Sequence, residues 1–185
     1  RISRLKRLML SKKIVRILES HNSLTGLIIE NLKILNKNSS VEFDGMWSSS
    51  LTDSATKGKP DNSSLDFSAR ISSLNDMMDV TTKPLVFDAD NGGQLEHLPF
   101  LIRSLERSGV SAIIMEDKIG LKKNSLFKNQ SDTQQDKPQT FAKKIKKICS
   151  ARRSNDFLVI ARIESFIVGK GLKDALNRAE IYSKA

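Results

Sequence analysis

Two carboxylates and two glycines follow a short apolar run in the segment PLVFDADNGG, residues 84–93. Side chains two residues apart in a strand point to the same side, so we expect Asp88 and Asp90 to lie close together and repel. Burying such a pair is costly unless a cation, a proton or a hydrogen-bond network compensates its charge. Glycines just beyond it allow a sharp turn or the close approach of a ligand. The segment indicates either a cation site or a capped, ion-paired strand end.

Three further segments place polar side chains where an apolar run ends. They read MWSSS, MEDKIGLKKNS and LVIARIES. Their candidate residues are Trp47, Ser48, Ser49 and Ser50 in the first, Glu116, Asp117, Lys118, Lys122, Asn124 and Ser125 in the second, and Arg162 and Glu164 in the third.

Carboxylates that converge from neighbouring strands suit a hard cation. Mg²⁺ fits best, because it takes one or two carboxylates and shares its shell with substrate oxygens. With 2 His and 1 Cys in the chain, a zinc site is not expected. Arg162 and Lys122 could hold a phosphate or carboxylate, the arginine through a bidentate fork. Singly, these residues also fit a solvated lysine or a salt-bridged strand end, but together they favour a site for phosphoryl chemistry.

Strand-like and helix-like segments alternate along the chain. We expect strands at residues 14–20, 42–51, 84–90, 110–117 and 156–165. We expect helices at residues 4–10, 24–35, 65–80, 97–109, 140–153 and 171–185, a serine-rich loop after the second strand, and a long polar loop at 118–137. This alternation predicts an α/β protein with a parallel sheet, whose ligand sites gather at the carboxyl ends of the strands.

The sequence contains neither GxGxxG nor GxxxxGK[ST], so a barrel is favoured over an open nucleotide-binding sheet. A complete (β/α)8 barrel takes about 250 residues, whereas this chain has 185. Five strands and an end within a helix therefore predict one domain, residues 1–185, that forms only the N-terminal part of a TIM-like barrel.

Composition excludes several other classes. The net charge is +10, but aromatic residues make up only 5% and do not interleave with the basic clusters at 4–16 and 143–153, so we expect no nucleic-acid partner. No apolar run approaches the roughly 20 residues that span a bilayer, so we expect no membrane span. A single cysteine, Cys149, rules out an internal disulfide and is typical of a reducing compartment, which predicts a cytoplasmic location.

Taken together, these segments resemble the phosphoenolpyruvate mutase branch of the isocitrate lyase superfamily. The matching stretches are ESHNSLTG, FDGMWSSSLTDSATKGKPD, FDADNGG, MEDKIGLKKNSLF and IARIESFI, in family order and with near-family spacing. The resemblance implies an oligomeric α/β barrel that interconverts phosphoenolpyruvate and phosphonopyruvate with Mg²⁺, the first step of phosphonate biosynthesis. It also implies an association with a nucleotidyltransferase domain.

The resemblance further implies a role for each candidate. Asp88 would be the main magnesium-side carboxylate, with Asp90 and Glu116 holding the ion through water; Trp47, Ser49 and Arg162 would bind the substrate; Lys122, Asn124 and Ser125 in a gating loop, and Asp61 on the neighbouring loop, would act in phosphoryl transfer.

The same loop separates the branches of the superfamily. Its lyases carry a cysteine in the gating loop, whereas this loop reads KKNS. Phosphonopyruvate hydrolase is the nearer alternative, and it usually has threonine where this chain has Asn124. A third alternative is a catalytically silent barrel part that binds a partner chain or an anionic metabolite. Asn124 favours the mutase.

Overall fold

The computed structural model describes residues 1–185 except 37–38, 121, 125–129 and 131–132. The described helices are α1 (Ile2–Ser11), α2 (Ser23–Asn31), α3 (Ser50–Ala55), α4 (Phe67–Val80), α5 (Leu98–Arg107), α6 (Pro138–Ala151) and α7 (Gly171–Ser183). The described strands are β1 (Ile17–Glu19), β2 (Lys33–Asn36), β3 (Ser39–Glu42), β4 (Gly45–Ser48), β5 (Leu85–Asp88), β6 (Ala112–Glu116) and β7 (Leu158–Arg162).

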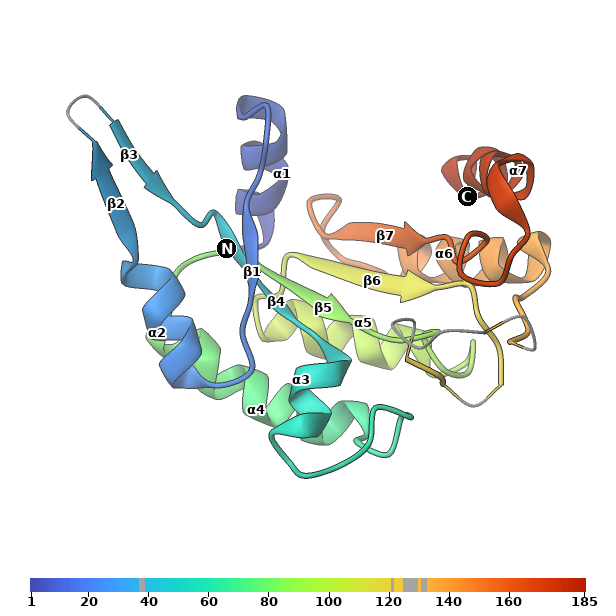
Figure 1. Ribbon diagram of the computed structural model, residues 1–185, viewed down its shortest axis with the longest axis horizontal. Helices are drawn as coiled ribbons and strands as arrows, with labels where there is room; N and C mark the ends of the chain where they lie inside the picture. Colours follow the sequence, from blue (N-terminus) through green and yellow to red (C-terminus); the bar gives the residue numbers. More distant parts are fainter. Residues whose placement is uncertain (37–38, 121, 125–129, 131–132) are drawn as a thin grey trace.

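Five strands form one parallel sheet in the order β1-β4-β5-β6-β7 (Figure 1). After β1, each new strand of this sheet is added beside the one before it, as in a barrel. Because all five run the same way, their carboxyl ends lie at one edge. The predicted α/β class with a parallel sheet is confirmed, and each of the five expected strands is present within the predicted ranges.

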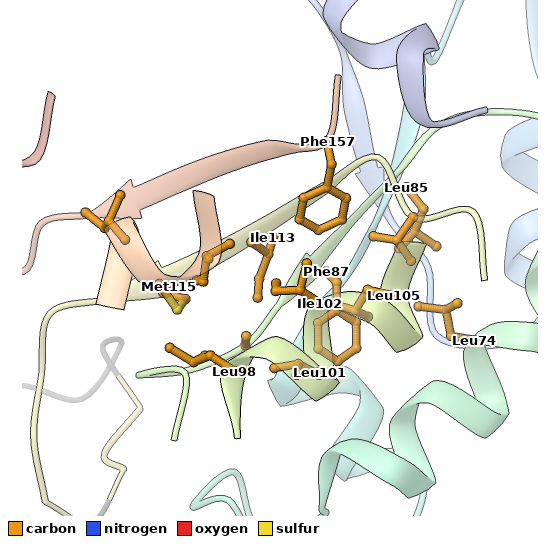
Figure 2. Close-up of a cluster of buried hydrophobic side chains, with 14 of the residues drawn as sticks. Leu74, Leu85, Phe87, Leu98, Leu101, Ile102, Leu105, Ile113, Met115 and Phe157 are labelled. Carbon is orange, nitrogen blue, oxygen red and sulfur yellow. The ribbon is translucent and has the colours of Figure 1, made fainter. Parts of the chain in front are cut away.

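Helices α2, α4, α5, α6 and α7 contribute to the core on one face of this sheet. On α5, Leu98, Leu101, Ile102 and Leu105 recur at helical spacing and are buried, so the helix lays one apolar stripe on the sheet (Figure 2). Neighbouring helices pack in the order α4, α5, α6, α7. The core of this layer lies beneath the strands and fixes their spacing.

The side chains of β5 alternate between the two faces, which is how the sheet separates core from site. Leu85 and Phe87 belong to the large helix-side cluster, whereas Val86 packs on the other face with Ala112 and with Leu5 of α1. By the same period of two, Asp88 follows Val86 to the face opposite helices α4 to α7.

The expected helix at 24–35 is wrong in its last third. Helix α2 ends at Asn31, and β2 pairs with β3 as an antiparallel hairpin that stands apart from the main sheet (Figure 1). Leu32 already has extended backbone angles, φ −67° and ψ 117°. The run after it pairs with residues 39–42, a tertiary contact that helical periodicity does not encode. The serine-rich loop expected after the second strand likewise begins with the short helix α3.

Within the part of the chain that the structure describes, no helix has the length and apolar character needed to cross a membrane.

The turn after β5 depends on a glycine, which gives a stability prediction. Gly92 has φ +78°, and a Cβ there would lie 2.5 Å from the sulfur of Met115. We expect Gly92→Ala to lower the free energy of unfolding by roughly 2–5 kcal/mol, through backbone strain and overpacking. Gly58→Ala is the control, because Gly58 has φ +64° but no atom of the described residues lies within 4 Å of such a Cβ. Denaturant unfolding of both variants checks this, and equal losses would contradict the packing argument.

Candidate active site

A pocket of about 320 Å³ opens at the carboxyl edge of the parallel sheet. Of the ten residues to which the family resemblance assigns a role, eight line it: Trp47, Ser49, Asp61, Asp88, Glu116, Lys122, Asn124 and Arg162. Asp90 adjoins the pocket through Lys122. Ser125 lies outside the described residues. Residues separated by more than a hundred positions in the sequence therefore meet in one cavity, because parallel strands end at the same edge.

Asp88 and Asp90 lie close together, but not as two residues of one strand. Strand β5 ends at Asp88, and Asp90 sits in the following turn with φ +49°, in the left-handed region. The backbone N–H of Asp90 donates to Oδ1 of Asp88 at 3.0 Å, and Ser50 Oγ donates to Oδ2 of Asp88 at 3.2 Å. Burial, and then the charge of Asp90, raise the pKa of Asp88 above its ordinary value. The pair is thus a buried acidic centre that favours a nearby positive charge.

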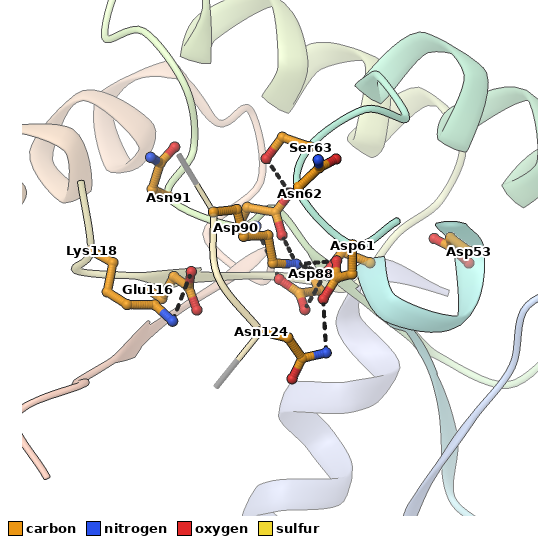
Figure 3. Close-up of polar contacts among 12 residues, drawn as sticks. Asp53, Asp61, Asn62, Ser63, Asp88, Asp90, Asn91, Glu116, Lys118 and Asn124 are labelled. Carbon is orange, nitrogen blue, oxygen red and sulfur yellow. Dashed lines mark hydrogen bonds and ion pairs between the residues drawn. The ribbon is translucent and has the colours of Figure 1, made fainter. Parts of the chain in front are cut away.

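Lys122 supplies that positive charge. Its ammonium lies 2.6 Å from Oδ1 of Asp61 and forms an ion pair with Asp90 and a hydrogen bond with Ser50 (Figure 3 shows the cluster around Asp61, Asp88 and Asp90). Burial lowers the pKa of Lys122, but the carboxylates of Asp90, Asp61 and Asp88 outweigh it, so the pKa is above the ordinary lysine value. Asn124 Nδ2 donates to Oδ2 of Asp61 at 3.2 Å. The segment that carries Lys122 and Asn124 is therefore held against the pocket by charge.

On the other side of the pocket, two acids alternate with two bases. Strand register places Glu116 beside Arg162. The guanidinium of Arg162 lies 3.7 Å from Glu116 and 2.6 Å from Glu164, and the ammonium of Lys118 lies 3.6 Å and 3.3 Å from the same two carboxylates. Burial outweighs both cations and raises the pKa of Glu116 to about 7. Arg162 is the most exposed of the four, at 32%, and so can still meet an anion in the pocket.

Two contributors were not found from the sequence. Arg70 is buried on α4, where its Nε donates to Asp53 at 2.8 Å and its Nη1 donates to the backbone carbonyl of Asp88. Helix periodicity could not indicate this, because an arginine on a helix is ordinarily solvated. Glu19 also lines the pocket, and its carboxylate accepts a hydrogen bond from Thr52 at 2.9 Å. Its place at the end of β1 could have indicated this role, because the other strands of the sheet also end in polar residues that line the pocket.

The oxygen donors at this pocket are of the kind that a hard divalent cation prefers. Asp88, Asp90 and Glu116 are buried, and burial raises the pKa of Asp88 and of Glu116, so a cation bound beside them would stabilise their ionised forms. Among the described residues, however, no three His, Cys, Asp or Glu side chains are gathered as a ligand set. The ammonium of Lys122 meets Asp61 and Asp90 instead. The donor chemistry therefore fits Mg²⁺, while the compensating charge in this arrangement comes from lysine.

The consecutive parallel strands and a polar pocket at their carboxyl edge define an α/β protein of the barrel class, with its ligand site where such proteins place it. A family model described as phosphoenolpyruvate phosphomutase matches residues 5–185. The chain belongs to the phosphoenolpyruvate phosphomutase family.

Known relatives of the chain are similar to it in sequence and in structure. The chain is 35% identical over 185 residues to the phosphoenolpyruvate phosphomutase of Tetrahymena pyriformis, covering 99% of this chain and 58% of the relative. The crystal structure of phosphoenolpyruvate phosphomutase from Streptomyces platensis subsp. rosaceus superposes with a TM-score of 0.88 at 32% identity, covering 99% of this chain and 60% of that one. Phosphonopyruvate hydrolase in complex with oxalate and Mg²⁺ superposes with a TM-score of 0.79 at 27% identity, covering 97% and 58%. The chain thus spans about 60% of the length of these proteins.

The raised pKa of Glu116 predicts a pH dependence of stability in the protein without divalent cation. The pKa rises from 4.5 to about 7 on folding, so between these values the folded state holds a proton that the unfolded state has lost. This contribution to stability is present below about pH 4.5 and disappears as the pH rises through about 7. We expect the free energy of unfolding, measured in chelator across this range, to fall less steeply with pH in Glu116→Gln than in the wild type.

The matched control is Glu180→Gln, because Glu180 is 68% exposed and pairs only at the surface with Lys184. This variant should keep the wild-type slope. A slope in Glu116→Gln equal to that of the control would contradict the assigned pKa.

Proposed function

We propose that this chain forms the substrate pocket of a phosphoenolpyruvate mutase, an isomerase that interconverts phosphoenolpyruvate and phosphonopyruvate. The observation that carries the proposal is one pocket that combines Lys122, Asn124 and Arg162 with the acids Asp61 and Asp88. Such a pocket can hold an anion with two charged ends, a carboxylate and a phosphoryl group, while the acids attract a divalent cation. Membership of the family and the similarity to phosphomutases support the same conclusion.

Each end of the substrate has a counterpart in this proposal. Arg162 binds the carboxylate through its partly exposed guanidinium, and Trp47 and Ser49 form the wall of the pocket beside it. Lys122 and Asn124 bind the phosphoryl oxygens. To do so, both side chains give up the contacts that they make with Asp61 in this structure. Asp61 then lies next to the transferring group and holds both side chains in place between turnovers.

The proposed reaction transfers a phosphoryl group within one bound molecule. The bond from phosphorus to the enol oxygen of phosphoenolpyruvate breaks, and a bond from phosphorus to the methylene carbon forms, so atoms and charge balance without a co-reactant. Mg²⁺, held by Asp88 with Asp90 and Glu116, would supply charge neutralisation for the pyruvate enolate oxygens and the phosphoryl group. The segment with Lys122 excludes water, so that the phosphoryl group reaches carbon and is not hydrolysed.

The same proposal extends to the surroundings of the enzyme. We propose a homo-oligomeric, cytoplasmic protein of phosphonate biosynthesis that works with a nucleotidyltransferase domain, and that residues 1–185 form one domain. Exposed apolar side chains on α2 and the β2–β3 hairpin, such as Leu24 at 67% and Ile34 at 61%, support a contact between subunits. The remaining elements rest on the family resemblance.

A phosphorus NMR time course with phosphonopyruvate and Mg²⁺ tests the reaction, using the full natural polypeptide. We expect a phosphoenolpyruvate signal to grow, because the pocket excludes water during transfer. Growth of inorganic phosphate in its place would contradict the mutase and move the assignment to the hydrolase. An unchanged spectrum would contradict both activities and favour a catalytically silent binding role.

Asp88 provides the matched variant for the same assay. We expect Asp88→Ala to lower the rate of isomerisation at least 10³-fold, because it removes the buried carboxylate on which charge neutralisation depends. Asp76→Ala, at an exposed position on α4, is the control and should retain the wild-type rate. Wild-type turnover by Asp88→Ala would contradict the proposed site.

A further inference from the structure

A buried carboxylate outside the pocket gathers four donors. Asp117 follows Glu116 and has no exposed surface. Gln135 Nε2 lies 3.0 Å from both of its oxygens, the backbone N–H of Glu164 donates to Oδ1 at 2.9 Å, and Arg178 Nη1 and the hydroxyl of Tyr182 donate to Oδ2 at 3.0 Å and 2.7 Å. A fully buried charge persists only when it is paired and hydrogen-bonded in this way. We call Asp117 and its partners Gln135, Glu164, Arg178 and Tyr182 the Asp117 clamp.

The donors come from three separate parts of the chain, so the clamp joins them. Gln135 lies shortly before α6, Glu164 follows β7, and Arg178 and Tyr182 lie on α7. Backbone contacts reinforce the junction: the N–H of Asp117 donates to the carbonyl of Arg162 at 3.2 Å, and its carbonyl accepts from the N–H of Asp136 at 2.7 Å.

The clamp affects the position of Arg162. By holding the backbone N–H of Glu164, Asp117 fixes the start of the Glu164 side chain. The carboxylate of Glu164 in turn lies 2.6 Å from the guanidinium of Arg162 and 3.3 Å from the ammonium of Lys118. The direction of Arg162, the cation for the substrate carboxylate, therefore depends on a residue that does not itself line the pocket.

The clamp also fixes the residues that flank the segment carrying Lys122 and Asn124. Both ends of residues 118–136 are fixed at the clamp: Lys118 forms an antiparallel bridge with Gln135, and the N–H of Ile119 donates to the carbonyl of Gln134 at 2.9 Å. Arg178 also donates to the carbonyl of Asp136 at 2.8 Å. A shift of α7 would thus move the residues that flank the segment carrying Lys122 and Asn124.

We propose that the Asp117 clamp is a positioning network for the reaction, in which Tyr182 and Arg178 on α7 set, through Asp117, the orientation of Arg162 and the base of the segment that carries Lys122. This inference rests on the proposed function and adds positioning residues to it. Neither Arg178 nor Tyr182 lines the pocket, so both act through other residues.

Tyr182→Phe is the decisive variant, because it removes one donor and keeps the aromatic ring that packs 4.9 Å from the ring of Phe141. In the full natural polypeptide we expect kcat to fall roughly ten-fold, the worth of a hydrogen bond to a charged group, and KM for phosphonopyruvate to rise. Ser183→Ala, the adjacent residue on α7, removes a hydroxyl that donates only to the carbonyl of Glu180 and should change neither constant.

A second variant separates positioning from a general loss of stability. If Tyr182 acts on KM through Glu164, Tyr182→Phe should change KM no further once Glu164→Gln is present. Independent, multiplying effects of the two substitutions would overturn the proposed route. A conservative substitution at Arg178 adds a further test. Arg178→Lys keeps a positive charge beside Asp117 and should retain more activity than Arg178→Met.

Hydrogen exchange provides a readout that does not depend on turnover. We expect the amides around Glu164 and Ile119 to exchange faster in Tyr182→Phe than in Ser183→Ala, because both lie at contacts that the clamp fixes. Equal exchange in the two variants would overturn the clamp. If the wild type lacks mutase activity but the exchange difference is present, the proposed function fails while the clamp stands.

Discussion

Buried negative charge at the carboxyl edge of the sheet is the constraint on which the rest of this structure depends. Parallel strands end with acids at one edge, and the elements around that edge keep those acids largely away from water. Several acids at or near this edge are matched with a base: Asp53 with Arg70, Asp61 and Asp90 with Lys122, Glu164 with Arg162 and Lys118, and Asp117 with Arg178. These pairs join β5, β6, β7, α4, α7 and the segment over the pocket into one arrangement.

The same constraint explains why the pocket suits an anion that arrives with a divalent cation. Lys122 and Arg162 are bound to carboxylates in this structure, so an anionic substrate must compete for them. A divalent cation bound by the acids would make Lys122 available to the substrate, because it would neutralise the carboxylates that now pair with the lysine. In the proposed mutase, substrate, cation and covering segment would then assemble together, which is how a phosphoryl group can be moved without loss to water.

Much of this could be predicted from the sequence, because period-two alternation and strand ends are local signals. The polar residues that follow apolar runs at Asp88, Glu116 and Arg162 do meet in one pocket. The hairpin of β2 and β3 could not be predicted, since its pairing is a tertiary contact that overrides the helical pattern before it. Nor could the left-handed turn at Asp90, which replaces the expected strand geometry, or the buried Arg70, whose partners are distant in sequence.

Affinity for a divalent cation, measured with Mn²⁺ as a probe for wild type and Lys122→Met, tests the central claim most directly. If the ammonium of Lys122 compensates the buried acids, removing it should tighten Mn²⁺ binding at least ten-fold, because a close competing charge is lost. Lys147→Met removes the same charge from an exposed position on α6 and should leave the affinity near the wild-type value. Unchanged or weaker binding in Lys122→Met would contradict the account.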